Sequence, residues 1–173
     1  MQIIKSKKIH FPLRYPSRTR MANIETGLID KLLSGDIRSR TISKDAANGM
    51  YIGQPVFPYY WYGHPRHSHK VYPVKDFMYV VDLIPIKIEA TPYGISISID
   101  GIKNYLFQIE NFQLRGNGRK QIREWAMGEG FTDIYLFLAL YALNAKFEGV
   151  IVVFVDDFIF KRRAINPPFL PPL

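Results

Sequence analysis

The residues best suited to chemistry are a carboxylate between two glycines and a basic, hydroxyl-rich segment far upstream of it. Glu129 stands between Gly128 and Gly130, where a permissive backbone lets a side chain project into a cleft. A carboxylate close to Arg38 or Lys44 would form a charged site capable of acid–base work. Taken alone, Glu129 also fits a salt-bridge partner in a loop.

The upstream segment reads Arg-Ser-Arg-Thr-Ile-Ser-Lys from Arg38 to Lys44 and follows Gly35. Glycine allows the preceding helix to end in a left-handed turn. Arg38, Arg40 and Lys44 then alternate with hydroxyl side chains such as that of Thr41, so one short segment offers several hydrogen-bond donors. This pattern suits a site that binds an anion, and it equally fits a solvated loop after a helix.

Three histidines crowd one loop. His64, His67 and His69 lie beside Arg66 and Lys70, and imidazoles at such spacings can converge on zinc. The neighbouring cations would repel a metal ion, and the chain has no cysteine to help bind it. The sequence therefore favours a solvated or phosphate-facing loop, with no metal and no cofactor.

The segment before that loop combines rings with positive charge. Tyr59, Tyr60, Trp61 and Tyr62 run consecutively, and aromatic rings near cations can stack bases and neutralise phosphates. The alternative is that the rings fill a core. Because strand side chains alternate, one pair would be buried and the other exposed.

Charge is concentrated near the N-terminus. The chain has 173 residues and a formal net charge of +8. Residues 1–44 contain ten Lys or Arg against three acids, a net +7. Such a concentration favours a polyanionic partner, nucleic acid or an anionic membrane surface, over scattered surface lysine.

The composition indicates one globular domain with a real core, being 47% hydrophobic and 14% aromatic. The absence of cysteine fits an intracellular protein, and no apolar run approaches the roughly 20 residues of a membrane span. We therefore expect a cytoplasmic protein with no membrane partner. Serine-hydrolase, P-loop and dinucleotide motifs are absent.

Apolar spacing and turn residues predict short strands with a few short helices. In chain order we expect a strand over 3–13, a helix over 24–33 capped by Asn23, a polar turn over 43–49, an edge strand over 51–62, a β-rich run over 75–88 broken at Pro85, a hairpin of 95–99 with 105–114, a basic loop over 115–120, helices over 121–127 and 132–145, and a buried strand over 149–160. This is an α+β pattern, favouring a small barrel. A single domain spans 1–165, and a proline-rich tail spans 166–173.

Two of these stretches, in this order, resemble the ASCH domain of the PUA-like superfamily. Leu32–Gly35 is similar to its helix end, Arg38–Ile42 to its basic-hydroxyl segment, and Ala126–Phe131 to its Ala-x-x-Glu-Gly-Phe segment. Val150–Phe160 resembles its closing strand. The resemblance implies a small PUA-like (ASCH-type) β-barrel flanked by short helices.

The same resemblance implies a site. In characterised relatives a Lys and a Thr of the first motif, with the Glu of the second, serve acetylcytidine amidohydrolase activity, and other members bind or cut RNA. Thr41 and Glu129 match two of these positions, whereas Arg38 stands where relatives carry Lys. Arginine stays charged and suits forked phosphate recognition, so this substitution favours binding over catalysis.

We therefore expect binding of RNA or another single-stranded nucleic acid through a basic and aromatic cleft. The alternatives are a hydrolase, either a ribonuclease or a modified-nucleoside amidohydrolase, and a protein-interaction module that uses the tail. The catalytic candidates are Glu129, Thr41 and Lys44, and the nucleic-acid-binding candidates are Arg14, Arg18, Arg20, Arg38, Arg40, Lys44, Tyr59, Trp61 and Arg66.

Overall fold

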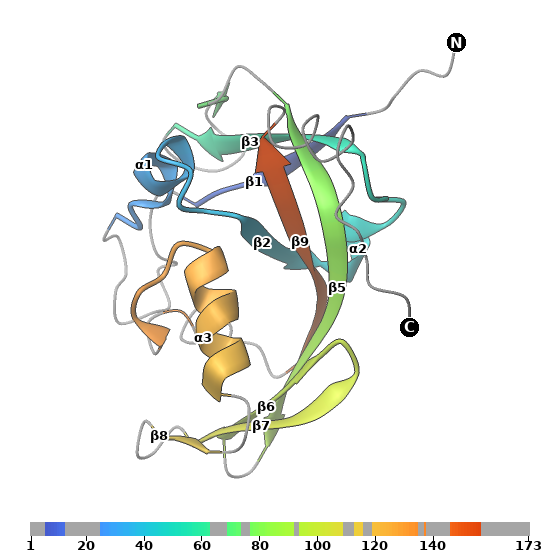
Figure 1. The fold of residues 1–173 in the computed structure, drawn as a ribbon, viewed down its shortest axis with the longest axis vertical. Coiled ribbons are helices and arrows are strands. Elements are labelled where there is room, and N and C mark those ends of the chain that lie inside the picture. The colour runs from blue at the N-terminus through green and yellow to red at the C-terminus, as the bar shows by residue number, and fades with distance from the viewer. Residues whose placement is uncertain are drawn as a thin grey trace, which may run out of the picture.

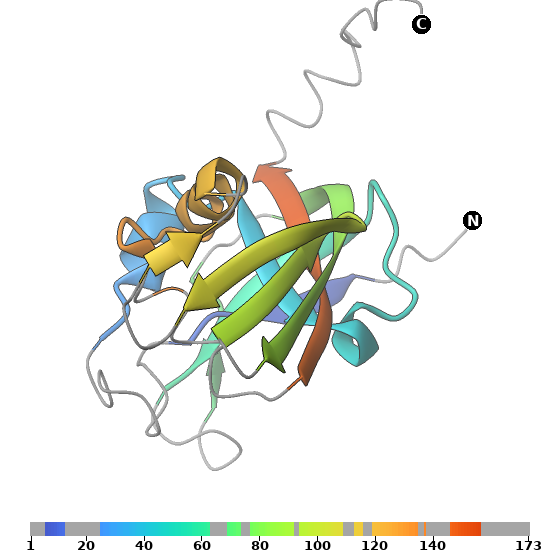
Figure 2. The same ribbon diagram turned by 90° about the horizontal axis from the view of Figure 1, so that it is seen from below.

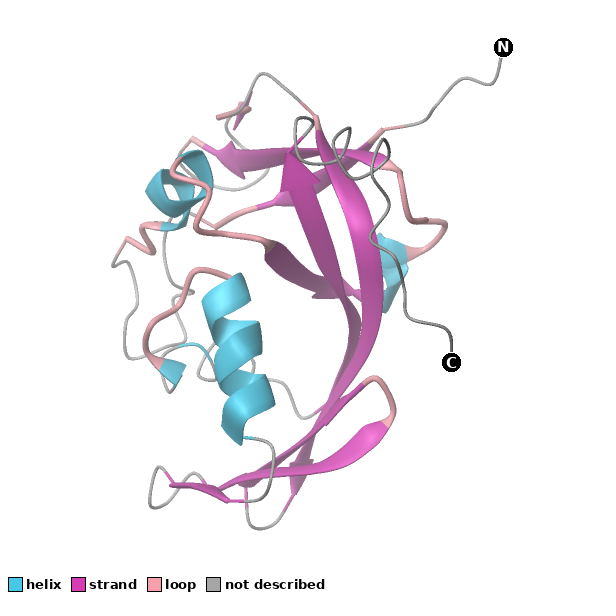
Figure 3. Cartoon of the chain, in the orientation of Figure 1, coloured by secondary structure: helices cyan, strands magenta, loops and turns pink. Residues whose placement is uncertain are grey.

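The computed structural model describes residues 6–12, 25–62, 69–73, 77–91, 94–108, 113–115, 119–134, 137 and 146–156. In chain order the elements are β1 (Lys7–His10), α1 (Leu28–Leu33), β2 (Ser39–Ser43), α2 (Lys44–Ala47), β3 (Pro55–Trp61), β4 (Lys70–Val71), β5 (Met78–Thr91), β6 (Gly94–Ile99), β7 (Ile102–Gln108), β8 (Gln113–Arg115), α3 (Arg119–Gly128) and β9 (Lys146–Asp156). Strands dominate, and the described helices are short (Figures 1 and 3). The α+β class is confirmed.

The strands form one mixed sheet built around the long β5. Along one edge β5 pairs with β9, which in turn pairs with β2. Along its other edge β5 pairs with β3 and β6. All described pairings are antiparallel except the one that joins β1 to β3. Figure 2 shows the strands twisted across one another, as right-handed strand twist requires.

The expected barrel is not closed by the described strands. Among them, no ladder joins β1 to β2. A side chain spans that gap instead, since Arg40 Nε donates to the His10 carbonyl oxygen at 3.3 Å. The two strands therefore approach each other without exchanging backbone hydrogen bonds there.

Strand β3 lies inside the sheet, so the expectation of an edge strand is wrong. It pairs with β1 on one side and, on the other, with β5 at Pro55 and Val56 and with β4 at Tyr60 and Trp61. Pro58 falls between these two ladders, where its missing N–H costs no hydrogen bond to β5 or β4. Pro85 likewise stays within β5, opposite Val150, and does not break the strand.

The turn between β6 and β7 follows from local chemistry. Asp100 and Gly101 have φ of 50° and 72°, the positive values that a two-residue hairpin turn prefers. The strand after the turn begins at Ile102, earlier than the expected 105.

Helix α1 is shorter than expected at its beginning. It starts at Leu28, after Gly27 with φ of 66°, and Asn23 lies outside the described residues. Leu28 and Leu32 are buried, as an i, i+4 pair on one face should be. Gly35 follows with φ of 79°, so the left-handed turn predicted at the helix end is confirmed.

The segment after β2 is helical where we expected only a turn. Lys44–Ala47 forms the single turn α2, capped by Ser43, whose hydroxyl accepts from the Ala46 amide at 3.3 Å. The predicted basic loop is also partly wrong, because Arg115 ends β8 and α3 begins at Arg119. Most of the predicted helix over 132–145 lies outside the described residues.

Helix α3 lies against the sheet and packs closely on β2. The Arg38 amide donates to the Gly128 carbonyl oxygen at 2.8 Å. A Cβ on Gly128 would come 2.7 Å from Ser39 Oγ, which explains a glycine at this contact. The buried residues of α3 join those of other elements in one apolar core: Ile9, Phe11, Leu28, Leu32, Ile37, Val56, Val80, Ile86, Ile88, Ile97, Ile122, Trp125, Ala126, Phe131, Phe137, Ile151, Val152 and Phe154.

Candidate functional site

The Glu129 carboxylate is buried and held by side chains and backbone of β2 and α3. Its side chain has no exposed area. Oε1 accepts from the Thr41 amide at 2.7 Å and from the Thr41 hydroxyl. The indole N–H of Trp125 lies 2.9 Å from the same oxygen and 2.8 Å from Thr41 Oγ1. Oε2 accepts from Arg40 Nη1 at 2.8 Å.

Local geometry explains why these residues meet. Trp125 lies near the end of α3, and Glu129, four residues later, directly follows the helix, so both point toward the same side. Strand β2 places the Thr41 amide opposite them, and the long side chain of Arg40 reaches round to the second carboxylate oxygen. A buried carboxylate is tolerated when donors and a cation replace its hydration, and this one has both.

Arg40 connects Glu129 with β1. Its side chain is 14% exposed. The guanidinium lies 5.8 Å from the centroid of the Phe11 ring, and Nε donates to His10. Arg40 is therefore committed to protein contacts on several sides, which favours a structural role for this cation.

The arrangement differs from the expected charged cleft. Thr41 and Glu129 are together, but the basic partner of Glu129 is Arg40, whereas we expected Arg38 or Lys44. Lys44 Nζ lies 3.9 Å from Glu148, with 76% of its side chain exposed. Arg38 holds α3 through its amide, and its side chain is exposed. An acid–base residue needs lone pairs that can reach substrate, so a buried and engaged Glu129 favours positioning over proton transfer.

A second group of residues forms what we call the aromatic face, on strands β1, β3 and β4. Opposite residues of paired strands share a face. The pairings are Lys8 with Phe57, His10 with Tyr59, and Lys70 with Trp61. Tyr72 joins them, with its ring 6.3 Å from that of Tyr59. The aromatic face thus consists of Lys8, His10, Phe57, Tyr59, Trp61, Lys70 and Tyr72.

Cations lie over the rings of this face. Lys70 Nζ is 4.8 Å from the Tyr59 centroid and 5.0 Å from the Trp61 centroid. Lys8 Nζ is 5.2 Å from the Tyr72 centroid. Strands β1, β3 and β4 contain no acidic residue. The rings are half-buried and Tyr72 is 41% exposed, so the face combines accessible rings with positive charge.

His10 is the titratable group between the two regions. Burial lowers the pKa of His10, and the positive charges of Arg40 and Lys70 lower it further. Its ring lies 5.4 Å from that of Tyr59. Burial also raises the pKa of the Tyr59 hydroxyl, with Tyr72 adding to the rise and Lys8 opposing it. At neutral pH both rings are therefore uncharged members of a cationic face.

The alternation expected for the four consecutive rings is incomplete. Tyr59, Tyr60 and Trp61 are all half-buried, while Tyr62 is 64% exposed. Tyr62 stacks on His69, with centroids 5.5 Å apart.

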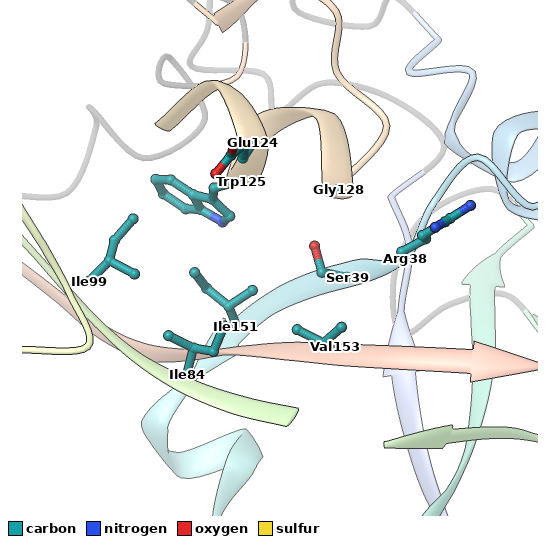
Figure 4. Close-up of a pocket in the computed structure, with 9 residues that line it drawn as sticks. All are labelled: Arg38, Ser39, Ile84, Ile99, Glu124, Trp125, Gly128, Ile151 and Val153. Carbon is teal, nitrogen blue, oxygen red and sulfur yellow. The ribbon is translucent and has the colours of Figure 1, made fainter. Parts of the chain in front are cut away.

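A pocket of about 330 Å³ lies between α3 and the sheet, shown in Figure 4. Its walls are mostly aliphatic, with the Trp125 ring on the helix side. Ser39 and Glu124 add polar atoms, and Arg38 lies at one end with its guanidinium directed outward. The lining residues are Arg38, Ser39, Ile84, Ile99, Glu124, Trp125, Gly128, Ile151 and Val153.

Several predicted site residues lie outside the described parts of the chain. These are Arg14, Arg18, Arg20 and Arg66, together with His64, His67 and the proline-rich tail over 166–173. Their roles stay predictions. Within the described residues, no helix is long and apolar enough to cross a bilayer.

Sequence reasoning missed Trp125, His10, Lys8 and Tyr72. The i, i+4 spacing of Trp125 and Glu129 was a signal that could have linked those two. No local signal relates β1 to β3, since their pairing joins segments that are distant in sequence.

Comparison of the chain with protein-family models, with curated proteins and with solved structures finds no match in any of the three.

Proposed function

We propose that the protein binds single-stranded nucleic acid, RNA foremost, across the aromatic face. The observation that carries this proposal is that Lys8 lies over the Tyr72 ring and Lys70 over the rings of Tyr59 and Trp61, while β1, β3 and β4 carry no acidic residue. Rings stack bases and lysines neutralise phosphates, which is the combination that sequence-tolerant single-strand binding requires.

Stacking of a base contributes more free energy than the contact between a lysine and a ring that it would replace. A cation over an exposed ring contributes about 0.5–1 kcal/mol. A base stacked on an aromatic side chain contributes about 1–3 kcal/mol. An arriving base can therefore displace the lysine from Tyr59 or Trp61, and the flexible lysine stem lets its ammonium turn to a phosphate.

The buried contacts of Glu129 support this proposal indirectly. Glu129, which directly follows α3, forms an ion pair with Arg40, and Arg40 in turn donates to the backbone of His10 on β1. We propose that Arg40, Thr41 and Glu129 keep β1, and with it the aromatic face, in position. The resemblance to ASCH domains also stays a proposal, for which the contact between Thr41 and Glu129 is support. A closed barrel and a cytoplasmic location likewise stay proposals.

The test is binding of a fluorescently labelled single-stranded oligouridylate, followed by anisotropy. Raising salt from about 50 to about 200 mM should weaken binding steeply, with a log–log slope near −0.7 per phosphate contact. Trp61→Ala should weaken it about five- to hundredfold, the equivalent of one lost stacking contact. Tyr51→Ala, at a 48% exposed tyrosine outside the face, is the matched control.

Two results would contradict the proposal. One is affinity that does not change with salt. The other is a folded Trp61→Ala variant that binds as tightly as Tyr51→Ala. A labelled duplex of the same length should bind more weakly, because paired bases cannot spread over the rings.

A further inference from the structure

The pocket beneath α3 has a planar, fixed wall. Trp125 is held by its indole N–H, which lies within hydrogen-bond distance of Thr41 and Glu129. On another side its ring packs against Phe137 in an edge contact, with centroids 4.4 Å apart. Because these contacts fix the ring, the surface that Trp125 turns to the pocket is preorganised (Figure 4).

The remaining walls are apolar and come from the sheet. Ile84 of β5, Ile99 of β6, and Ile151 and Val153 of β9 line the side opposite Trp125. The volume of about 330 Å³ is at the small end of ligand pockets, which run from about 300 to 1,000 Å³. An apolar slot of this size against an indole suits one flat ring system.

The polar atoms that line the pocket would contact the edge of such a ring. Ser39 Oγ lies beside Gly128 and can accept or donate. The Glu124 carboxylate accepts only, and Lys120 Nζ lies 3.8 Å from its Oε1 with both side chains largely exposed, so it can accept a further bond. The Arg38 guanidinium points away from the cavity in Figure 4, so nothing inside favours an anion.

We propose that this pocket is a second binding site, for one small, uncharged heteroaromatic ring whose N–H groups donate to Ser39 and Glu124. The ring lies against Trp125 between the aliphatic walls. Glu129 and Thr41 are positioning residues for this site, because they orient Trp125 without lining the pocket. The site is separate from the aromatic face and does not depend on nucleic-acid binding there.

The two tryptophans of the chain allow the sites to be tested apart. In Trp61→Phe, fluorescence reports on Trp125 alone. Titration of that variant with 9-methyladenine should change the emission saturably. The analogue whose amino group is dimethylated lacks both N–H donors and should bind about five- to hundredfold more weakly, the equivalent of two lost hydrogen bonds.

Two variants fill the pocket. Val153→Phe, or Ile99→Phe should the first fail to fold, should abolish the fluorescence change. Met127→Phe is the control, since it adds a ring to α3 at a 59% exposed position that does not line the pocket. The melting temperature of each variant is compared with that of the Trp61→Phe parent to verify that the variant folds.

Three outcomes would overturn the proposal. The first is no saturable change up to about 10 mM 9-methyladenine, a limit above which binding is negligible. The second is binding that survives both filled variants in folded form. The third is equal or tighter binding of the dimethylated analogue, which would indicate apolar contact only. Oligouridylate anisotropy reads the aromatic face separately, so either site can fail while the other stands.

Discussion

The Thr41 amide donates to Glu129 Oε1 at 2.7 Å, across 88 positions of sequence. This bond joins the middle of β2 to the residue that follows α3. With the Arg40 ion pair and the Trp125 indole, it makes Glu129 the polar centre of an otherwise apolar contact between helix and sheet.

Replacing this carboxylate should destabilise the protein. In Glu129→Gln the side chain carries no charge, so the partly buried Arg40 would lose its ion-pair partner, and the amide NH₂ would face donors that now bond to the carboxylate. The expected loss is about 3 kcal/mol in the free energy of unfolding, typical of a broken buried pair. Urea unfolding measures it. Glu124 lies on α3 with 62% of its side chain exposed, so the control Glu124→Gln should lose less than about 0.5 kcal/mol.

The same variant separates the structural role from a catalytic one. If Glu129 is structural, Glu129→Gln should lower the free energy of unfolding and leave any turnover of RNA or nucleosides unaffected in the folded protein. Turnover of RNA or of a modified nucleoside that disappears in this variant, with the free energy of unfolding unchanged, would instead support the hydrolase alternative.

A second prediction concerns the close approach of α3 to β2. Gly128→Ala places a Cβ 2.7 Å from Ser39 Oγ, so the Ser39 hydroxyl must rotate or helix and strand must move apart, at a cost of up to about 1–3 kcal/mol. Removing that oxygen should relieve the clash. In the Ser39→Ala background the same change should be neutral or stabilising by up to about 1 kcal/mol, because alanine favours the helix.

This double-mutant cycle is read from urea midpoints. A coupling energy near zero would show that Ser39 Oγ does not limit the approach, and that the cost of Gly128→Ala lies elsewhere.

Stability should depend on pH through His10. Burial first, then Arg40 and Lys70, lowers its pKa in the folded state. The unfolded chain therefore binds more protons near and below the ordinary histidine pKa of about 6.5. Stability rises with pH where the unfolded state holds the extra proton, so the contribution present at about pH 7.5 is lost on going to about pH 5.

The measurement compares urea unfolding at these two pH values for the parent chain and His10→Gln. The variant should lose less stability on acidification. An identical pH dependence in the parent and His10→Gln would contradict the assignment.

A fourth prediction tests the charge of the aromatic face. Lys70→Gln removes one phosphate contact, so the log–log salt slope of oligouridylate binding should become shallower by about 0.7. Lys87→Gln is the matched control, because Lys87 lies on β5 and pairs with Glu89 at 2.8 Å. Equal slopes for the two variants would place the bound strand elsewhere.

Local features of the fold followed from sequence, and pairings between distant segments did not. The Asp100–Gly101 turn was predictable because the backbone angles needed there select those residue types. The neighbours of β3 were not predictable. Pro55 and Pro58 suggest an edge strand, and only the structure shows that β3 pairs with β5 at one end and with β4 at the other. The start of α1 also differed, since Gly27 and Thr26 interrupt a pattern that apolar spacing alone would extend.

The candidate site shows the same division. The meeting of Thr41 with Glu129 was expected only through the family resemblance. Side chains alternate along a strand, so Arg40 should lie on the face of β2 opposite to that of Thr41. The alternation therefore did not indicate that Arg40 reaches Glu129. That contact depends on the length of the side chain and on the position of α3, which is set by packing.

The position of β9 between β2 and β5 has a consequence for synthesis on the ribosome. Ser39 of β2 pairs with Val153, and β5 pairs with β9 along most of its length. Neither strand can complete its ladder until residues 146–156 have left the exit tunnel. We expect the backbone N–H and C=O groups along these edges of β2 and β5 to stay unpaired in the nascent chain until then. The chain should therefore fold late and slowly, as long-range strand pairing requires.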